Sequence, residues 1–409
     1  MRIAIIGGGA AGFFAACRAK LLQPSCQVVL LESGSKVLSK VRISGGGRCN
    51  VTHACFDPKE LSIYYPRGGK ELRQAFSRFM TGDTMAWFED RGVPLKTESD
   101  GRIFPVSDNS ASIVNCLLDE ARQLGVEVRL NAMVDSLDVL PGGFQLSIRG
   151  SNVLQVDRVL IATGGHPKLS GFDWLAKLGH SIIPPVPSLF TFNVPGQRLK
   201  DLMGVSVNPV SVTLPDLQLT TQGPLLITHW GFSGPAILKS SSLAARELAT
   251  CQYTFKVVID WLNEVTFSNA LEQLQGFRKQ RTSARVFNGP SFNLPRRLWE
   301  FLVHRATIRD GINWSDLRKE ELERLANTLT ADVYQVAGKT TFKEEFVTCG
   351  GISLKEVDFK TMESKVVPGL YFAGEVLDID AVTGGFNFQA AWTTGYLAGS
   401  AMVVDKLSD

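Results

Sequence analysis

The chain has 409 residues, a formal net charge of +3 and 44% apolar residues, which predicts an ordered protein of two or three domains. This charge excludes a protein that is directed to polyanions by its overall charge, although a local basic patch stays open. Seven cysteines without a C-x-x-C motif and only five histidines argue against a disulfide framework, and we expect no metal. With no signal pattern and no apolar run long enough for a membrane span, we expect a cytoplasmic protein without a membrane partner.

The first predicted element is a buried strand that leads directly into a glycine-rich turn. Arg2-Ile-Ala-Ile-Ile6 is a short run dominated by apolar residues, and Gly7, Gly9 and Gly12 follow as G-x-G-x-x-G before a helical pattern begins. In this motif the first glycine allows the tight turn, the second lets the backbone approach a pyrophosphate, and the third lets helix and strand pack closely. The helix N-terminus then offers free N–H groups to phosphates. We expect a dinucleotide here; the alternative is a glycine-rich turn without a ligand.

A second strand, residues 28–31, ends in Glu32, twenty residues beyond Gly12. A carboxylate at this position can accept hydrogen bonds from an adenosine ribose and disfavours a 2′-phosphate. A basic stretch, residues 36–42, then precedes three glycines at 45–47. This stretch suits a chain that closes over a diphosphate and a flavin face, and a flexible surface loop is the alternative.

Later strands indicate that the chain returns to the same cofactor. Residues 155–161 form a hydrophobic strand that ends in Ala162-Thr163-Gly164-Gly165, an ending typical of two-dinucleotide flavoproteins. Near the C-terminus, residues 368–375 form a strand that ends in Glu375, which could bond a ribityl hydroxyl. A glycine turn then opens an apolar helix near Asn387, where a helix N-terminus would stabilise the negative charge of a reduced flavin. The alternative for this last segment is a structural turn.

Three motifs together resemble one known family. They are the turn at residues 7–12, Ser44-Gly-Gly-Gly-Arg-Cys-Asn-Val-Thr52, and Ala373-Gly-Glu-Val-Leu-Asp378 with Thr383-Gly-Gly-Phe-Asn387. The chain is similar over nearly its whole length to the BaiN/YhiN-type family of bacterial FAD-dependent oxidoreductases, and the Gly-Gly-Gly-Arg-Cys-Asn element is quite specific to that family. It departs mildly at Phe386 and Phe388, where Tyr and Leu are expected.

The resemblance implies an α/β fold with a Rossmann-like FAD-binding domain of the glutathione-reductase type, formed by residues 1–187 and 339–409. It further implies an inserted substrate domain, residues 188–338, made of a β-barrel and a helical part at about residues 264–330. Family members are described as reductases of conjugated steroid ketones or as aminoacetone-type oxidases, so the resemblance does not identify the substrate.

We expect FAD to contact residues from each of these turns. The predicted cofactor-binding residues are Gly7, Gly9, Ala11, Gly12, Glu32, Ser33, Lys40, Gly46, Gly47, Arg48, Cys49, Asn50, Val134, Ala162, Thr163, Gly164, Gly374, Glu375, Asp378, Gly385, Phe386, Asn387 and Phe388. No second G-x-G-x-x-G follows residue 165, so NAD(P)H as electron donor would have to visit the flavin site without a dedicated domain.

Three residues are the candidates for the chemistry. His229, next to Trp230 in the insertion, is the predicted proton donor, and the alternative is a His–Trp pair packed in the barrel. Arg48 and Asn50 complete the predicted catalytic set. The spacing of Cys49 and Cys55 differs from that of flavin disulfide reductases, so we interpret Cys49 as a small buried thiol.

We therefore expect a flavoprotein oxidoreductase that transfers a hydride between flavin N5 and a small organic substrate, by enone or ketone reduction with NAD(P)H or by amine oxidation. The alternative is an RNA-directed or regulatory flavoprotein, because residues 276–330 contain eleven Lys and Arg against six acids. The aromatic residues of that segment have spacings that favour core packing over base stacking. We interpret its cations as solvated helix faces and expect no nucleic-acid partner; the oligomeric state stays open.

Overall fold

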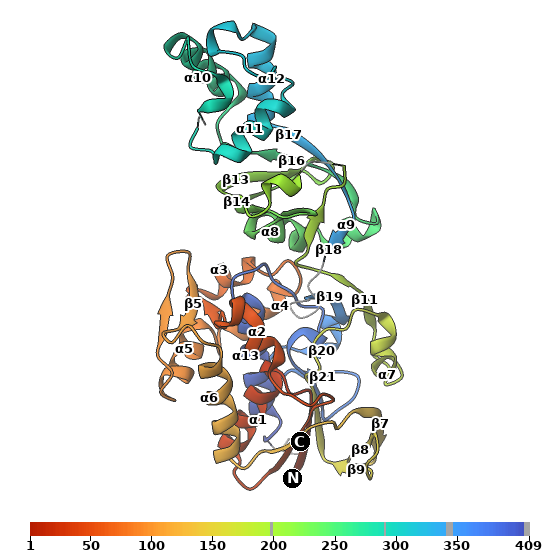
Figure 1. Cartoon of the computed structure of the whole chain (residues 1–409). Helices are drawn as coiled ribbons and strands as arrows, with labels where there is room; N and C mark the ends of the chain where they lie inside the picture. The colour runs from red at the N-terminus through yellow and green to blue at the C-terminus, as the bar shows by residue number, and fades with distance from the viewer. Residues whose placement is uncertain (197–198, 290–291, 341–346, 405–409) are drawn as a thin grey trace. The chain divides into compact units, whose positions relative to one another are not determined.

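The computed structural model describes residues 1–196, 199–289, 292–340 and 347–404. The chain divides into two compact units, the first formed by Met1–Ser188 with Lys343–Asp409 and the second by Leu189–Phe342. Both chain termini belong to the first unit (Figure 1). Across the described ranges, every helix is too short or too polar to serve as a membrane span.

A parallel sheet forms the centre of the first unit, which confirms the predicted α/β class. Strand β1 (Arg2–Ile6) lies between β2 (Gln27–Leu31) and β10 (Arg158–Ile161) and pairs in parallel with both. Four of the five β1 residues are buried, as expected for a strand that is covered on both faces. The full strand order is β20-β21-β22-β10-β1-β2-β6, with β6 (Glu127–Arg129), β20 (Val357–Asp358), β21 (Glu363–Ser364) and β22 (Leu370–Phe372). At one edge, β20 and β21 pair antiparallel.

Two helices from opposite ends of the chain pack directly against each other. They are α1 (Ala10–Leu22), which follows β1, and α13 (Phe386–Ala401). A Cβ placed on Gly395 of α13 would lie 2.6 Å from the carbonyl oxygen of Ala11. One turn further, a Cβ on Gly399 would lie 2.5 Å from the carbonyl oxygen of Ala15. The two glycines therefore let the α13 backbone approach the α1 backbone more closely than any side chain would allow.

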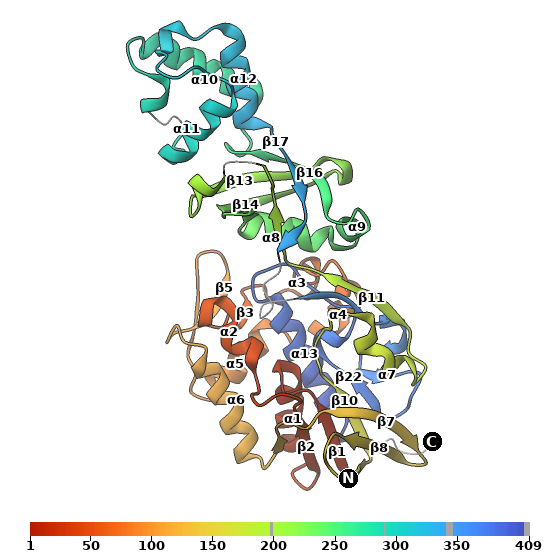
Figure 2. The same ribbon diagram turned by 45° about the vertical axis from the view of Figure 1, so that its right-hand side comes forward.

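Short elements surround this layer (Figures 1 and 2). The helices are α2 (Ser39–Gly47), α3 (Pro58–Ile63), α4 (Gly69–Phe76), α5 (Thr81–Glu89), α6 (Ala111–Gln123) and α7 (Asp173–Ala176). Two small antiparallel sheets are made by β3 (Thr52–His53), β4 (Leu95–Thr97) and β5 (Arg102–Pro105), and by β7 (Val134–Leu140), β8 (Gly143–Ile148) and β9 (Leu154–Val156).

The chain leaves and re-enters the first unit through two paired strands. β11 (Ile182–Pro187) runs antiparallel to β19 (Thr348–Ile352), with Pro187 opposite Thr348. The next residue, Ser188, donates its backbone N–H to the Val347 carbonyl at 2.8 Å. The two ends of the insertion are thus held next to each other.

The second unit is built on a seven-stranded antiparallel sheet and a group of helices. The strand order is β17-β16-β13-β14-β15-β12-β18. The strands are β12 (Thr191–Asn193), β13 (Ser206–Leu214), β14 (Leu219–Ile227), β15 (Gly231–Ser233), β16 (Thr254–Asp260), β17 (Asp332–Ala337) and β18 (Lys339–Thr340). The helices are α8 (Pro235–Leu243), α9 (Ala245–Thr250), α10 (Phe267–Gln280), α11 (Arg296–Arg305) and α12 (Lys319–Thr330).

A buried carboxylate connects the sheet of the second unit to its helices. Asp332, at the start of β17, is 4% exposed. It accepts hydrogen bonds from Tyr334 Oη on the same strand at 2.5 Å and from Trp261 Nε1, directly after β16, at 3.1 Å. Arg305, the last residue of α11, donates from Nε at 2.5 Å and lies over the Tyr334 ring. Burial raises the pKa of the Asp332 carboxyl, although these donors and the Arg305 charge act in the opposite direction.

Asp332→Ala is expected to lower the free energy of unfolding by about 3–5 kcal/mol, because it leaves Arg305 as a partly buried charge without its carboxylate. Urea unfolding followed by tryptophan fluorescence measures this. The matched control is Asp310→Ala. The Asp310 side chain is 83% exposed and, among the described residues, forms an ion pair with His304 alone. This substitution is expected to change the free energy of unfolding by less than about 0.5 kcal/mol. Equal effects of the two substitutions would contradict the role of Asp332.

Candidate functional site

The turn between β1 and α1 is shaped by three glycines with different surroundings. Gly7 has φ +116°, and a Cβ on it would lie 2.3 Å from the Ala162 carbonyl oxygen at the end of β10. A Cβ on Gly12 would lie 2.0 Å from the Gly7 carbonyl oxygen. Gly9, by contrast, has no atom within 4 Å of such a Cβ. Two glycines are therefore required by packing, while the third leaves open space at the N-terminus of α1, where anions bind favourably.

Glu32 is held at the end of β2 by backbone donors. Its Oε2 accepts from the Gly8 N–H at 2.9 Å, and its Oε1 accepts from the Gly34 N–H at 2.7 Å. Ser33 Oγ lies 3.2 Å from the same Oε1. An ionised carboxylate has about four acceptor positions, so Glu32 retains capacity for ribose hydroxyls. The Ala132 N–H donates to the Glu32 carbonyl at 2.8 Å, which brings the segment before Val134 beside this residue.

Three more predicted glycines face open space. Gly46, Gly47 and Gly164 all have positive φ, and a Cβ on any of them would meet no atom within 4 Å. The first two end α2, which begins at Ser39 and departs from helical geometry at Ser44. Gly164 follows Ala162 and Thr163 directly after β10. Like Gly9, these glycines have backbones with open space beside them, which fits the prediction that they approach a dinucleotide.

Lys40 and Glu375 connect α2 to the C-terminal part of the chain. Lys40 Nζ lies 2.7 Å from Glu375 Oε2. The other oxygen, Oε1, accepts from the Thr348 N–H at 2.8 Å. The Thr348 hydroxyl is buried and has no hydrogen-bond partner among the described residues. A Cβ on Gly165 would lie 2.4 Å from that hydroxyl, so the end of β10 packs directly on this pair.

The start of α13 is positioned by residues from the N-terminal part of the chain. Gly385, at φ +93°, would place a Cβ 2.6 Å from the Thr52 carbonyl oxygen. Oriented to satisfy both its polar atoms, the Asn50 amide accepts from the Gly385 N–H at 2.9 Å and donates to the Thr52 carbonyl at 3.0 Å. The Asn387 amide bonds the Ala381 N–H at 3.0 Å and its carbonyl at 3.2 Å. Both amides therefore hold the turn itself.

An aromatic cluster around Phe386 was missed by the sequence analysis. The Tyr64 ring stacks on Phe386 with centroids 4.3 Å apart and planes at 11°, and the His53 ring stacks at 4.5 Å. His53 Nδ1 lies 3.0 Å from the Gly384 carbonyl oxygen. Tyr65 Oη donates to the Phe386 carbonyl at 2.6 Å, and burial raises the pKa of this phenol. Phe386 lies more than 300 residues from His53, Tyr64 and Tyr65 in the sequence, and no motif connects it to them.

A buried ion pair near this cluster was also missed. Asp380 is fully buried and pairs with Arg67. Its Oδ2 also accepts from Ser188 Oγ at 2.6 Å. Burial raises the pKa of the Asp380 carboxyl, while Arg67 and the Ser188 hydroxyl oppose this change. Asp378, the residue that was predicted instead, donates its backbone N–H to the Ile352 carbonyl at 3.0 Å.

Arg48 and Cys49 have surroundings that limit their roles. Arg48 pairs with Glu98 at 2.7 Å and Asp108 at 3.5 Å and lies 3.9 Å over the Phe104 ring. Cys49 has no exposed surface, and burial raises the pKa of its thiol to about 12. Cys49 is therefore a buried, protonated thiol, as the sequence analysis expected, and Arg48 is largely neutralised by its own neighbours.

Phe388 and His229 are two further predicted residues. Phe388 is half-buried and stacks on Trp392 at 5.7 Å within α13. His229 belongs to the second unit, where it is exposed and packs edge-on against Trp230 at 4.2 Å. Trp230 Nε1 donates to Thr191 Oγ1 at 3.0 Å. The role of His229 as a proton donor, like those of Arg48 and Asn50, stays a prediction.

The first unit thus brings the predicted turns from both ends of the chain onto one parallel sheet. Four open glycines, a carboxylate at the end of β2 and the N-terminus of α1 fit a dinucleotide with a diphosphate and a ribose. Among the described residues, no group of three or more His, Cys, Asp or Glu side chains is placed to hold a metal ion.

Comparison with known proteins agrees with this geometry. The family model described as "HI0933-like protein Rossmann domain" matches residues 1–401. The chain is 30% identical to the 3-dehydro-bile acid delta(4,6)-reductase of Clostridium scindens, covering 98% of both chains. It is 32% identical to the ribosomal RNA dihydrouridine synthase of Escherichia coli, covering 99% of this chain and 98% of the relative. In fold it is similar to the 3-ketosteroid delta1-dehydrogenase of Sterolibacterium denitrificans, with a TM-score of 0.50, 11% identity and coverage of 98% and 99%.

Gly9→Ala and Gly12→Ala are expected to fail in different ways. A Cβ on Gly9 meets no protein atom, and the Gly9 φ of −92° suits alanine, so the apoprotein is expected to keep its melting temperature. The same Cβ would occupy the space proposed for the pyrophosphate, so the cofactor content is expected to fall. A Cβ on Gly12 collides with the Gly7 carbonyl, so both quantities are expected to fall. Flavin absorbance and thermal unfolding of the apoprotein measure the two effects. Normal cofactor content in Gly9→Ala would contradict a pyrophosphate at this turn.

Cys49 is expected to resist alkylation that modifies Cys251, because Cys49 is buried and Cys251 is exposed. Iodoacetamide at mildly alkaline pH followed by peptide mass spectrometry measures this, and labelling in urea is the control. Rapid labelling of Cys49 in the folded protein would contradict this expectation.

The raised pKa of the Cys49 thiol also affects the pH dependence of stability. As the pH rises, this thiol ionises in the unfolded chain before it ionises in the folded protein. Its contribution to stability is therefore present below pH 9.0 and is lost as the pH rises toward 12.

Proposed function

The chain belongs to the HI0933-like family, whose members are FAD-dependent oxidoreductases, and we propose that it reduces a carbon–carbon double bond conjugated to a carbonyl group. One observation carries the proposal: two kinds of relative, about equally similar along almost the whole chain, share this chemistry. One is named as a delta(4,6)-reductase of a 3-dehydro bile acid, and the other is named for making dihydrouridine. In both products a double bond next to a carbonyl has been saturated.

The proposed reaction consumes one hydride and one proton for each bond reduced. FAD, when bound, supplies the ring that passes a hydride to the carbon β to the carbonyl. The proton goes to the α carbon, and NAD(P)H replaces the electrons by visiting the same site. We place the reaction in the cytoplasm, where this reductant is available. Amine oxidation, the other reaction considered from the sequence, has no counterpart in the names of these relatives.

The residues of the first unit support this proposal through binding rather than chemistry. Gly9 and Gly164 leave space for the cofactor backbone, and Glu32 can orient the ribose. The N-terminus of α13 would stabilise negative charge on a reduced flavin if the ring were bound beside it. His229 remains the proposed proton donor, with Arg48 and Asn50 as the other proposed catalytic residues.

A second candidate is the reduction of a uracil ring within RNA rather than a free enone. One observation of this chain favours it: the excess of Lys and Arg over acids in residues 276–330. Uracil also contains a carbon–carbon double bond conjugated to a carbonyl group. The two candidates therefore share the same reaction and differ in the substrate, which is a small enone in the first and an RNA in the second.

The purified holoprotein is expected to lose its flavin absorbance when NADPH is added without oxygen. An unsaturated 3-oxo steroid or a uridine-containing RNA is then expected to restore it, with a product heavier by one H₂ in mass spectrometry. The saturated ketone of the same skeleton is the control, because it lacks the conjugated bond. Reduction of the flavin by an amine such as aminoacetone, with no re-oxidation by any conjugated substrate, would contradict the proposal.

A further inference from the structure

We propose that one end of the helical part of the second unit binds the phosphate backbone of a structured RNA. This inference deepens the second candidate above and rests on the proposed function. The residues that form this cationic surface are Arg278, Lys279, Arg281, Arg285, Arg296 and Arg297.

The cationic surface comes from a segment without acids. Residues 273–299 contain these six cations and no Asp or Glu. The whole chain has a net charge of only +3, so the positive charge is concentrated here rather than spread over the protein. All of the six except Arg278 are exposed. Neutralisation of phosphates by exposed Lys and Arg is the main source of affinity for nucleic acids.

Packing holds the parts of this segment together. Phe277 of α10 lies 5.7 Å from Trp314, and Trp299 of α11 stacks on the same ring at 6.2 Å. Trp299 Nε1 also donates to the Val286 carbonyl at 2.8 Å. The end of α10, the segment after it and the start of α11 therefore share one small core, and Figure 2 shows α10, α11 and α12 together in this part of the second unit.

Several of these cations interact with neutral groups. Arg278 donates to the Leu317 carbonyl at 3.2 Å, and Arg297 donates to the Asp201 carbonyl at 3.2 Å. Arg281 lies 4.5 Å over the Phe277 ring. Carbonyls and rings orient a guanidinium without cancelling its charge, so the positive potential of the surface persists. Arg296 differs, because it pairs with Glu300 at 2.8 Å.

The first turn of α11 is unfavourable for the helix itself. Arg296 and Arg297 occupy this turn, which contains no acid. The positive end of the helix dipole favours acids and disfavours cations at this position. Both arginines have partners that offset this cost, since Arg296 pairs with Glu300 and Arg297 donates to the Asp201 and Met203 carbonyls. These contacts hold the two cations in place at the start of α11.

The exposed side chains of this segment favour RNA over a lipid surface as its partner. Within residues 273–299, no described large apolar side chain is exposed. A helix that lies in a membrane interface needs an apolar face to insert, and this segment offers none. Contacts to phosphates need only cations and polar groups.

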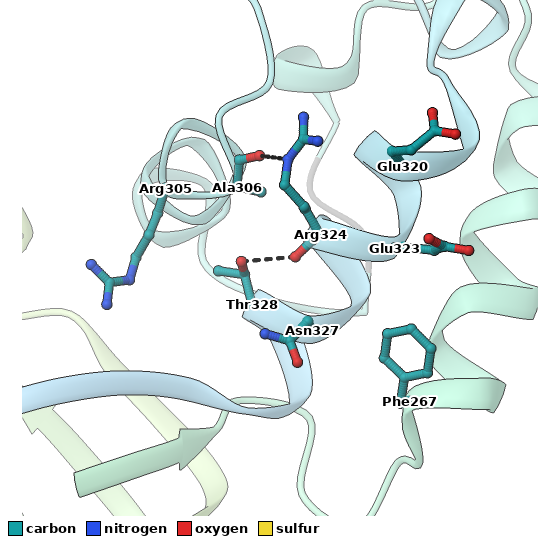
Figure 3. A pocket seen from close by; sticks show the side chains of 8 residues that line it. All are labelled: Phe267, Arg305, Ala306, Glu320, Glu323, Arg324, Asn327 and Thr328. Atoms are coloured by element: carbon teal, nitrogen blue, oxygen red, sulfur yellow. Dashed lines mark hydrogen bonds between the residues drawn. The ribbon is translucent and has the colours of Figure 1, made fainter. Parts of the chain in front are cut away.

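The open pocket of the helical part lies elsewhere and has mixed charge (Figure 3). It is lined by Phe267 at the start of α10, and by Arg305, Arg324, Glu320 and Glu323 among others. Arg324 donates from Nε to the Ala306 carbonyl at 3.0 Å. The two glutamates offset the two arginines, so this pocket does not extend the cationic surface.

The test is retention of an RNA transcript that contains a stem and loop, measured by filter binding over a range of salt concentrations. The variant carries Lys279→Glu, Arg281→Glu and Arg285→Glu. Wild-type protein is expected to bind with strong salt dependence, and the variant is expected to lose about tenfold or more in affinity. The slope of log affinity against log salt is expected to fall by about 0.9 for each phosphate contact that is lost.

The matched control carries Arg122→Glu, Lys177→Glu and Lys360→Glu, three exposed cations of the first unit. It changes the net charge by the same amount and is expected to bind the transcript like wild-type protein. Melting temperature and flavin absorbance check that each variant is folded. If the reversed variant unfolds, Lys279→Gln with Arg285→Gln is expected to show a smaller loss in the same direction.

Three results would overturn the proposal: no binding by wild-type protein, equal loss in both triple variants, or retention on phosphatidylserine vesicles in preference to the transcript. Binding is measured without turnover, so the two proposals fail separately. If the protein binds the transcript through these residues but reduces no conjugated substrate, the RNA-binding surface is supported and the proposed function is contradicted. If the protein reduces an enone but does not bind the transcript, only the RNA-binding surface is contradicted.

Discussion

The architecture of the first unit depends on direct contact between the backbones of α1 and α13. Gly395 and Gly399 make this contact possible, because any Cβ on them would collide with the carbonyls of Ala11 and Ala15. The crossing anchors the end of the chain on the helix that follows the first strand. It therefore also determines where α13 begins, and with it the position of the Gly385 turn beside Asn50. A larger residue in this crossing would disturb a site several turns away.

Most charged side chains of the candidate site are already balanced by the protein. Glu32 accepts from backbone N–H groups, Lys40 pairs with Glu375, and Arg48 pairs with Glu98. Recognition of the cofactor is therefore expected to depend on shape and on backbone N–H groups more than on free charges.

The local motifs made much of the first unit predictable from the sequence. The strand, turn and helix at residues 2–22 follow from apolar periodicity and glycine spacing, which are properties of neighbouring residues. The Phe386 cluster and the Asp380 pair were not predictable, since His53, Tyr64 and Arg67 reach them only through the tertiary fold. The Asn50 amide illustrates the same limit, because one of its two partners, the Gly385 N–H, lies more than 300 residues away. Spacing identifies a motif but does not show how its side chains are already engaged.

The pairing of β11 with β19 means that the second unit is attached at two adjacent points. Pro187 lies opposite Thr348, and Ser188 is bonded to both Val347 and Asp380. All described strands of the parallel-centred sheet come from the sequence before or after the insertion, and none comes from the insertion itself. A different insert could be joined at these two points without rethreading any strand of the first unit. Exchange of this kind offers a simple evolutionary route by which one flavin scaffold could acquire new substrates while its binding turns stay unchanged.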